Sequence, residues 1–502
     1  MDALPAPACI IGLLALLVIL LLRWWPSRRL PPGPKGLPLL GNLLQVPSTL
    51  LFVKLVEWSK LYGPIYSYTL LGQPIIVLSG LREATEILDR LSAKTSDRPH
   101  MIKLYDFMSR GKQFGAAPAN DLWRRHRRAA HESLTIRAGR DYRPTQVEEA
   151  RILLNGLINH PEIDIYQHLH RQSCSLAWRT FFGHEAISLE GPNPAKPMEG
   201  FFREMFRAAV PGGSIVDIFP FLKPMIARSK FLRRQSDVFY EEATSFFVSS
   251  FIAPQLSDRS SMSSRLKETG KLIGIDSDVD CGWAAGTMFF AAHDATTTAV
   301  RWFLIAMLLY PEKASAAKAQ LDSVVGDRPP NFSDFENLPQ VQALVKEILR
   351  WRPPTPAGLA HMATEDIIYG QYLIPKGAIL ISNTWSICRD PSVYSNAEDF
   401  DPSRFLDGDG NIKRSRPDTH DDHLAFGHGR RMCVGKDFAL NVVWITVAHL
   451  LWAFEFKKGR DQHGREVVPD PTQFVDNGAV TWPEQFTIDL VPRFPDLAER
   501  LR

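Results

Sequence analysis

The chain has 502 residues, of which 45% are hydrophobic and 23% are charged, and its formal net charge is +3. This length and composition allow a substantial buried core, and length alone would permit two or three domains. The small net charge, without a basic stripe interleaved with aromatic residues, argues against nucleic acid as a partner. The five cysteines form no Cys-x-x-Cys pair, so the sequence indicates neither a zinc site nor a disulfide framework.

The N-terminal segment 4–22 is apolar from Ala8 onward, and basic residues such as Arg23 and Arg29 follow it. Its length is close to the roughly 20 residues that span a bilayer, so residues 1–25 are predicted to form a membrane anchor. No Lys or Arg precedes the segment. The positive-inside rule therefore predicts a single-pass protein whose body faces the cytosol, and we expect the membrane to be that of the endoplasmic reticulum. A cleaved signal peptide is the alternative, although its charged region should come first.

Residues 26–40 contain Pro31-Pro32-Gly33-Pro34, which predicts a stiff, extended hinge. Residues 41–502 follow and are predicted to be mainly helical with a smaller β part, because long apolar-periodic stretches surround a few short β-rich runs. The segments 65–70 and 74–78 flank a Gly-Gln pair and predict a hairpin. Further short strands are expected at 367–369, 372–374 and 378–381.

The longest predicted helix runs from about Asp280 to Leu309 and is apolar on most faces, so we expect it to cross the centre of the protein. The largely polar segment 261–278 before it is predicted to be a loop. Within the helix, Asp294 and Thr296 are candidates for proton transfer. Alternatively, Asp294 pairs with a neighbouring base and the threonine bonds back to a helix carbonyl.

Glu347 and Arg350 lie three residues apart in the apolar-periodic stretch 341–351, so they share one helix face. A Glu–Arg pair of this kind, taken alone, is usually a solvated surface bridge of small consequence. The segment Trp123-Arg124-Arg125-His126-Arg127, taken alone, is a basic helix face.

The segment 426–435, Phe-Gly-His-Gly-Arg-Arg-Met-Cys-Val-Gly, places one cysteine on a glycine-rich turn before an apolar helix. Gly429 can adopt positive φ and leaves room for a flat macrocycle. Cys433 precedes the helix N-terminus, which favours thiolate over thiol. Arg431 can offer donors to a haem propionate, and Phe426 can shield the sulfur. The pattern predicts a thiolate ligand for haem iron, with a buried structural cysteine as the alternative.

This loop, the Glu347-x-x-Arg350 helix and the segment Pro402-Ser403-Arg404-Phe405 together resemble the cytochrome P450 family, the haem-thiolate monooxygenases, over nearly the whole chain. The resemblance implies one mainly α, α+β fold in which residues 41–502 form the haem-thiolate catalytic domain. It implies haem as the cofactor, Cys433 as the iron ligand, and a buried lock of three charged residues formed by Glu347, Arg350 and Arg404. The sequence as a whole, including the segment 350–354, resembles fungal members of this family that serve secondary metabolism.

The resemblance also assigns cofactor contacts. Trp123 and Arg127 match the family's Trp-x-x-x-Arg segment, in which both side chains reach haem propionates, and His361 occupies a position that often meets a propionate. An ordinary polar strand residue is the alternative for His361. Arg431 and Phe426 complete the expected cofactor-binding set around the cysteine.

The segment around Asp294 resembles the family's oxygen-activating segment but departs from it at one position. The family has threonine directly after the acid, whereas this chain has Ala295, with Thr296 one place later. One residue is a rotation of about 100° on a helix, so Thr296 points elsewhere unless a local bulge restores the register. Our hypothesis is that ordered water or a substrate hydroxyl assists proton delivery in this chain.

The implied partners are O2, a lipophilic small-molecule substrate, the membrane and an NADPH-dependent flavoprotein reductase, because no flavin or nicotinamide motif is evident in the chain. Basic residues suited to docking an acidic reductase are Arg124, Arg125, Arg128 and Arg430. Two alternatives remain open. One is a haem-thiolate isomerase or dehydratase that needs no external electrons, which Ala295 favours. The other is a non-catalytic haem-binding sensor.

Overall fold

The computed structural model describes residues 29–209, 213–253, 260–413 and 424–501, which divide into two compact units. The smaller unit comprises the described residues up to Pro99, with Ala357–Ile387 and His428–Arg430. The larger unit comprises the rest of the described chain. The predicted anchor, residues 1–25, lies outside the described residues, within which no helix is long and apolar enough to cross a bilayer.

The smaller unit is built on a four-stranded sheet with the order β1-β2-β6-β3, in which β2 and β6 are parallel and the other pairs antiparallel. The predicted hairpin is confirmed, with its turn at Leu71-Gly72, one residue before the predicted Gly-Gln pair. Leu71 and Gly72 have φ values of 50° and 82°, as a two-residue turn between twisted strands requires. Strands β4 and β5 form a separate hairpin. The elements of this unit are β1 (Ile65–Leu70), β2 (Gln73–Leu78), β3 (His361–Met362), β4 (Ile367–Tyr369), β5 (Tyr372–Ile374), β6 (Ile379–Ser382), α2 (Leu51–Tyr62), α3 (Leu81–Ala84), η1 (Thr85–Arg90), α4 (Ser92–Thr95) and α16 (Thr384–Ile387).

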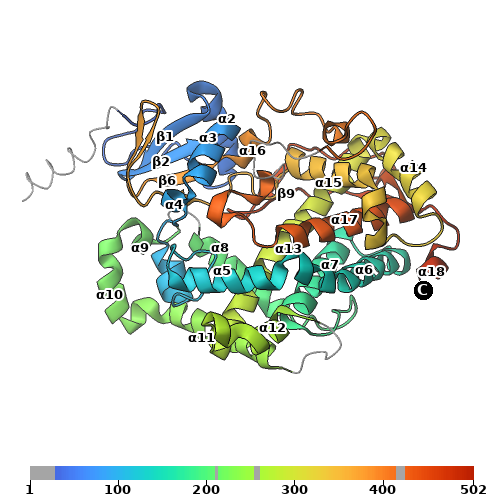
Figure 1. Cartoon of the computed structure of the whole chain (residues 1–502), viewed down its shortest axis with the longest axis horizontal. Helices are drawn as coiled ribbons and strands as arrows, with labels where there is room; N and C mark the ends of the chain where they lie inside the picture. Colours follow the sequence, from blue (N-terminus) through green and yellow to red (C-terminus); the bar gives the residue numbers. More distant parts are fainter. Residues whose placement is uncertain (1–28, 210–212, 254–259, 414–423, 502) are drawn as a thin grey trace, which may run out of the picture. The chain divides into compact units, whose positions relative to one another are not determined.

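The larger unit is mainly helical, so the predicted α+β composition is confirmed (Figure 1). Its helices are α5 (Asp121–Leu134), α6 (Ile136–Asn159), α7 (Ile165–Ala177), α8 (Lys196–Ala209), α9 (Ile215–Ile218), α10 (Lys223–Arg228), α11 (Lys230–Ile252), α12 (Met262–Thr269), α13 (Asp278–Leu309), α14 (Ser315–Val324), α15 (Pro339–Trp351), α17 (Lys436–Ala453) and α18 (Leu497–Arg500). Its short π- and 3-10-helical segments are η2 (Ile102–Met108), η3 (Trp178–Phe182), η4 (Pro220–Leu222), η5 (Gly270–Ile273), η6 (Pro311–Ala314), η7 (Phe332–Asn337), η8 (Pro402–Phe405) and η9 (Leu424–Phe426). Its strands form two antiparallel pairs, β7–β10 and β8–β9. They are β7 (Phe454–Lys458), β8 (Phe474–Asp476), β9 (Thr481–Pro483) and β10 (Ile488–Pro492).

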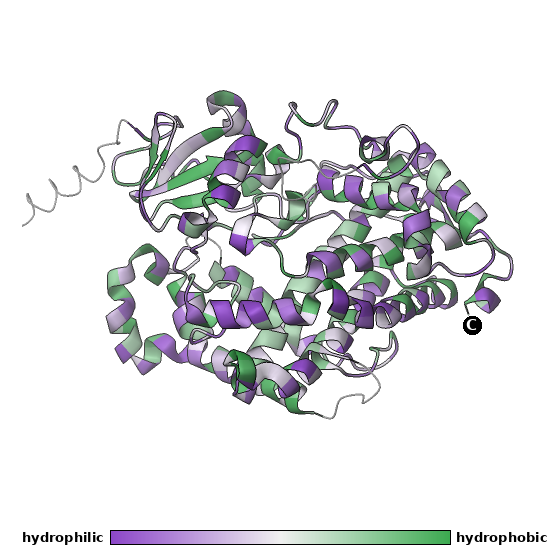
Figure 2. Cartoon of the chain, viewed as in Figure 1, coloured by the Kyte–Doolittle hydropathy of each residue, from purple (hydrophilic) through white to green (hydrophobic). Residues whose placement is uncertain are grey.

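Helix α13 is the centre of the larger unit, as its apolar sequence predicted. The Ser277 hydroxyl caps its N-terminus by accepting the Asp280 backbone N–H at 3.0 Å. Helices α7, α11 and α17 pack along it, and most of its side chains are buried. Ala291 is exposed and Ala295 is half-buried, so one face in the middle of this core helix is left open by its neighbours. Figure 2 shows the contrast with α5, whose residues are largely hydrophilic.

The polar segment 261–278 is not a loop throughout, and that prediction is wrong. It contains α12 and η5, because Ser261 and Ser264 form a reciprocal capping box and the side chains of Met262 and Leu266, one turn apart, are buried. Two buried apolar residues on one face are enough to hold a short helix whose other positions are polar.

Candidate functional site

The cysteine loop has the geometry that its glycines predicted. Gly427 and Gly429 have φ values of 79° and 55°, and the short helix η10 (Gly429–Arg431) follows directly. The backbone N–H of Cys433 donates to the carbonyl of Phe426 at 2.8 Å, which closes the loop. Helix α17 begins at Lys436, so the sulfur lies just before a helix N-terminus.

Gly429 is required for a different reason from the one expected. A Cβ at this position would lie 2.3 Å from the carbonyl oxygen of Leu88 and 2.8 Å from the Cβ of Ser92. The Gly429 N–H also donates to Asp89 Oδ1 at 2.6 Å. The space that we assigned to a macrocycle is therefore taken by the protein's own segment 88–92 within the smaller unit.

The Cys433 side chain is exposed. Desolvation by the surrounding loop raises the pKa of this thiol above its ordinary value, although the backbone N–H of Gly435 and the charge of Arg127 act in the opposite direction. A bound iron ion would hold the sulfur deprotonated, since metal coordination removes the thiol proton outright.

Two arginines and a tryptophan adjoin the cysteine loop. Asn120 caps α5 by accepting the Trp123 N–H at 2.9 Å, which fixes Trp123 and Arg127 on one face. Arg127 Nη2 donates to the Met432 carbonyl, and the Arg431 guanidinium lies 4.1 Å from the centre of the Trp123 ring. Arg431 also donates to the Ala117 carbonyl at 2.7 Å.

The Arg127 guanidinium meets no anionic side chain among the described residues. Burial lowers its pKa. A desolvated cation without a counter-ion is costly, so the site fits an additional anionic group such as a haem propionate. The structure thus brings together Trp123, Arg127, Arg431 and Cys433 as predicted.

The other two predicted cofactor contacts are Phe426 and His361. Phe426 is half-buried and packs against the core cluster that includes Trp444 and Val443. His361 lies on β3 in the smaller unit, where its buried ring contacts the Thr95 carbonyl through Nδ1 at 2.8 Å. Their contacts with the cofactor stay predictions.

On α13 the structure agrees with the alternative interpretation, in which Asp294 pairs with a neighbouring base and Thr296 bonds back to a helix carbonyl. The Thr296 hydroxyl donates to the Ala292 carbonyl at 2.9 Å, and α13 is regular through this segment, so no bulge turns Thr296 into the place of Ala295. Asp294 Oδ1 lies 2.8 Å from Nδ1 of His293. The roles of Asp294 and Thr296 in catalysis stay predictions.

His293 is the residue that the sequence analysis missed, although a histidine directly before the acid was a visible signal. Burial disfavours the charged ring, but hydrogen bonds to Asp294 and Cys174 outweigh it and raise the pKa of His293 to about 9. Burial would raise the pKa of Asp294, but the hydrogen bond and charge of His293 lower it instead. The two side chains therefore form a charged pair at neutral pH.

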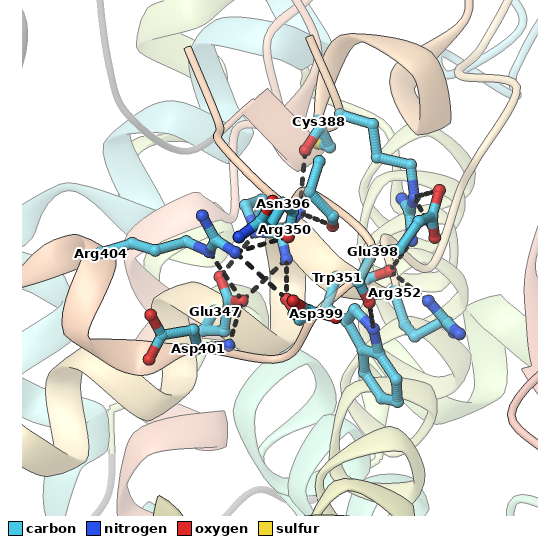
Figure 3. Close-up of polar contacts among 12 residues, drawn as sticks. Glu347, Arg350, Trp351, Arg352, Cys388, Asn396, Glu398, Asp399, Asp401 and Arg404 are labelled. Carbon is cyan, nitrogen blue, oxygen red and sulfur yellow. Dashed lines mark hydrogen bonds and ion pairs between the residues drawn. The ribbon is translucent and has the colours of Figure 1, made fainter. Parts of the chain in front are cut away.

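The three-residue lock is confirmed (Figure 3). Glu347 is fully buried and accepts from Arg350 Nε at 2.6 Å and Nη2 at 2.7 Å. Arg404 Nε lies 3.4 Å from Glu347 Oε1, and the Asp401 N–H donates to the same oxygen at 2.7 Å. Arg350 Nη1 also donates a hydrogen bond to the Ala397 carbonyl at 2.7 Å. The lock therefore fixes the irregular segment 388–404 to α15.

Comparisons with known proteins agree with this geometry. A family profile described as Cytochrome P450 matches residues 31–477. A cytochrome P450 monooxygenase of Armillaria gallica is 38% identical over 476 residues, covering 93% of this chain and 92% of its own. Cytochrome P450 monooxygenase 58 of Postia placenta is 35% identical, with 94% and 90% covered, and monooxygenase claR of Ampulloclitocybe clavipes is 32% identical, with 97% and 91% covered.

Proposed function

Because the chain belongs to the cytochrome P450 family of haem-thiolate monooxygenases, we propose that it uses O2 and electrons from a separate NADPH-dependent flavoprotein reductase to hydroxylate or otherwise oxidise a lipophilic small molecule. The observation that carries this proposal is the position of Cys433 beside Arg127, a half-buried cation for which the described residues supply no anionic side chain. A haem needs both a thiolate for its iron and cations for its propionates.

Iron protoporphyrin supplies the redox chemistry when it is bound in enzymes of this family. In this chain Cys433 would hold the iron, while Arg127, Arg431 and Trp123 would hold the propionates. His361 is a further proposed propionate contact, which rests on resemblance. These residues would bind and orient the cofactor, and the hydrogen bond from the Cys433 N–H to the Phe426 carbonyl fixes the loop backbone at the cysteine.

Electrons are proposed to come from outside the chain. The Gly427-His428-Gly429 sequence lacks the third glycine of a dinucleotide-binding loop, because Met432 stands in its place. The guanidinium groups of Arg124 and Arg128 are exposed on α5, although each also pairs with an acidic residue of that helix. We propose this exposed basic face as part of the surface that meets the reductase.

Membrane association is proposed on two observations. The first is the apolar N-terminal segment 4–22, which would place the catalytic domain on the cytosolic side of the endoplasmic reticulum membrane. The second is a run of exposed apolar side chains in the larger unit that includes Phe221, 75% exposed, and Phe231, 84% exposed. Basic residues such as Lys223 and Lys230 stand among them, as in surfaces that meet anionic lipid.

A fungal secondary metabolite, a terpenoid or a polyketide, is the proposed substrate class. Its support is the fungal origin of the relatives and the small side chains of Ala291 and Ala295 on the open face of α13. Ala295 also keeps an isomerase or dehydratase as the second candidate, since this residue cannot donate a proton.

The test is co-expression with a reductase and a panel of lipophilic metabolites. We expect the reduced, carbon-monoxide-treated protein to show thiolate-ligated absorption, Cys433→Ser to lose it, and product to require NADPH. Thiolate absorption with turnover that needs neither NADPH nor reductase would support the isomerase instead. A histidine-type spectrum, or no bound porphyrin, would refute both.

A further inference from the structure

A line of titratable side chains leads from the surface of the larger unit to Asp294. Asp294 on α13 contacts Nδ1 of His293 at 2.8 Å. The His293 ring meets the ring of His170 on α7 edge to face, with centroids 4.6 Å apart. His170 Nε2 lies 3.7 Å from Oε1 of Glu199 on α8, and both of these side chains are about two-fifths exposed, 41% and 40%.

Helical geometry explains how Asp294 can connect two sides of α13. At about 100° per residue, Ala291 and Ala295 share the open face, whereas His293 and Thr297 share the face toward α7. The contact of Thr297 with Ser173 on α7, at 2.7 Å, confirms that direction. Asp294 lies on the flank between the two faces, and its side chain is 32% exposed while that of His293 is 5% exposed.

His293 is an unusual choice for this position if packing is its only role. Its ring stacks with those of Phe202 and Phe289, which an apolar residue would also do. A buried charged pair costs desolvation energy that good packing alone would avoid. The titratable groups that face His293 are Asp294 on its own helix and His170 and Cys174 on α7. Histidine is the side chain that takes up and releases protons near neutral pH.

We propose that His170 and His293 form a proton-supply path from solvent beside Glu199 to Asp294, an inference that rests on the proposed monooxygenase function. The path belongs to this chain's own residues and requires no threonine after the acid. It thereby offers an origin for the protons that Ala295 cannot relay.

The transfer balances at every step. His293 passes its Nδ1 proton to Asp294, Asp294 releases that proton toward the open face of α13, and the His293 ring is left neutral with its proton on Nε2. His170 first takes one proton from solvent and, once charged, passes one proton to the vacant Nδ1 of His293. Rotation of either ring about its terminal torsion, which is broad in histidine, or one water molecule closes the gap between the two nitrogens. One proton enters for each proton delivered, and each group returns to its starting charge.

His170→Gln and His293→Asn test the path, since both amides keep a hydrogen-bonding group but cannot carry a proton. The control is His463→Gln, at an exposed histidine of a surface loop. We expect all three variants to show wild-type carbon-monoxide spectra. In the two path variants, product per NADPH should fall about tenfold, less than a full general-acid effect because water can substitute. Hydrogen peroxide release and the solvent isotope effect should rise together, and the control should match wild type.

A second readout does not depend on turnover. Histidine carbon signals of the diamagnetic, reduced carbon-monoxide protein can be titrated by NMR. We expect the His293 signal to titrate well above an ordinary histidine and to move down in Asp294→Asn, because the carboxylate that stabilises the charged ring is removed.

The experiments distinguish failure of the proton path from failure of the proposed monooxygenase function. Wild-type coupling and isotope effect in His170→Gln, with a normal carbon-monoxide spectrum, would overturn the path, and this half-exposed variant decides the question even if His293→Asn misfolds. Loss of the thiolate spectrum in the wild-type protein would instead refute the proposed function.

Discussion

Arg127 on α5 donates a hydrogen bond from Nη2 to the carbonyl of Met432, the residue before the cysteine. This contact ties the basic helix to the cysteine loop and places a cation beside the sulfur. The bond satisfies one donor only, and the charge of the guanidinium stays uncompensated among the described residues. We infer that Arg127 has two roles: its hydrogen bond to Met432 holds the cysteine loop, and its charge is available to bind an anionic group.

Arg127→Gln should therefore weaken haem retention. Loss of a charge-assisted hydrogen bond to a propionate costs about 1.5–3 kcal/mol, so we expect haem affinity to fall roughly 10- to 150-fold. The measurement is haem transfer to an acceptor protein, followed by absorbance. Arg128→Gln, one residue later on the exposed face of α5, is the matched control. Equal haem loss in both variants would contradict the assignment.

Glu347→Gln should be strongly destabilising. It leaves Arg350 buried without its counter-ion, and breaking such a pair costs about 3–5 kcal/mol. The free energy of unfolding from urea titration measures the effect. Glu204→Gln removes the partner of Arg207 in an exposed pair and should cost less than about 1 kcal/mol. Comparable losses in the two variants would show that burial does not govern the lock.

Gly429→Ala should destabilise the smaller unit through two effects. The residue has a φ of 55°, and its new Cβ would lie 2.3 Å from the Leu88 carbonyl oxygen. Gly464→Ala is the control, because Gly464 has a φ of 76° but no atom within 4 Å of the Cβ position. We expect the control to lose about 1–2 kcal/mol from backbone strain alone and Gly429→Ala to lose clearly more. Similar thermal midpoints would exclude the close approach as the reason for glycine.

Acid should destabilise the protein partly through His449. Burial lowers the pKa of His449 to about 4, although the Ile445 carbonyl, which contacts its Nδ1, acts against it. The folded state keeps this ring neutral, while the unfolded state binds a proton below about pH 6.5, so stability falls as the pH drops from 6.5 toward 4.

His449→Leu should remove about 2–3 kcal/mol of the stability lost between pH 7 and pH 4.5. Thermal midpoints of both proteins across this range provide the measurement. His131→Leu, at an exposed position on α5, should leave the acid dependence unchanged. Parallel curves for wild type and His449→Leu would show that another group governs the acid response.

Ala295→Thr and Thr296→Val separate the two positions after the acid. Ala295 is half-buried beside the open face of α13, so a hydroxyl there should assist proton delivery and lower peroxide release per NADPH. The Thr296 hydroxyl is held by the Ala292 carbonyl, so its removal should change peroxide release little. Unchanged release in Ala295→Thr would refute the role of that position, and a large increase in Thr296→Val would restore Thr296 as a relay.

Elements that depend on residues close together in the sequence were predicted correctly. The hairpin of β1 and β2 follows from two β-rich runs around a glycine turn, and α13 follows from a long apolar run. Segment 261–278 failed because its helix depends on Met262 and Leu266 meeting a core that composition does not reveal. The hinge and the domain boundaries stay predictions.

Patterns of residues a few positions apart were enough to predict the cysteine loop, the spacing of Trp123 and Arg127, and the Glu347–Arg350 pair. What occupies the space beside Gly429, the lack of a carboxylate partner for Arg127 among the described residues, and the contact of His170 with His293 became visible only in the folded chain. Those facts join residues far apart in the chain, and packing, burial and charge between distant segments are set when the whole core closes.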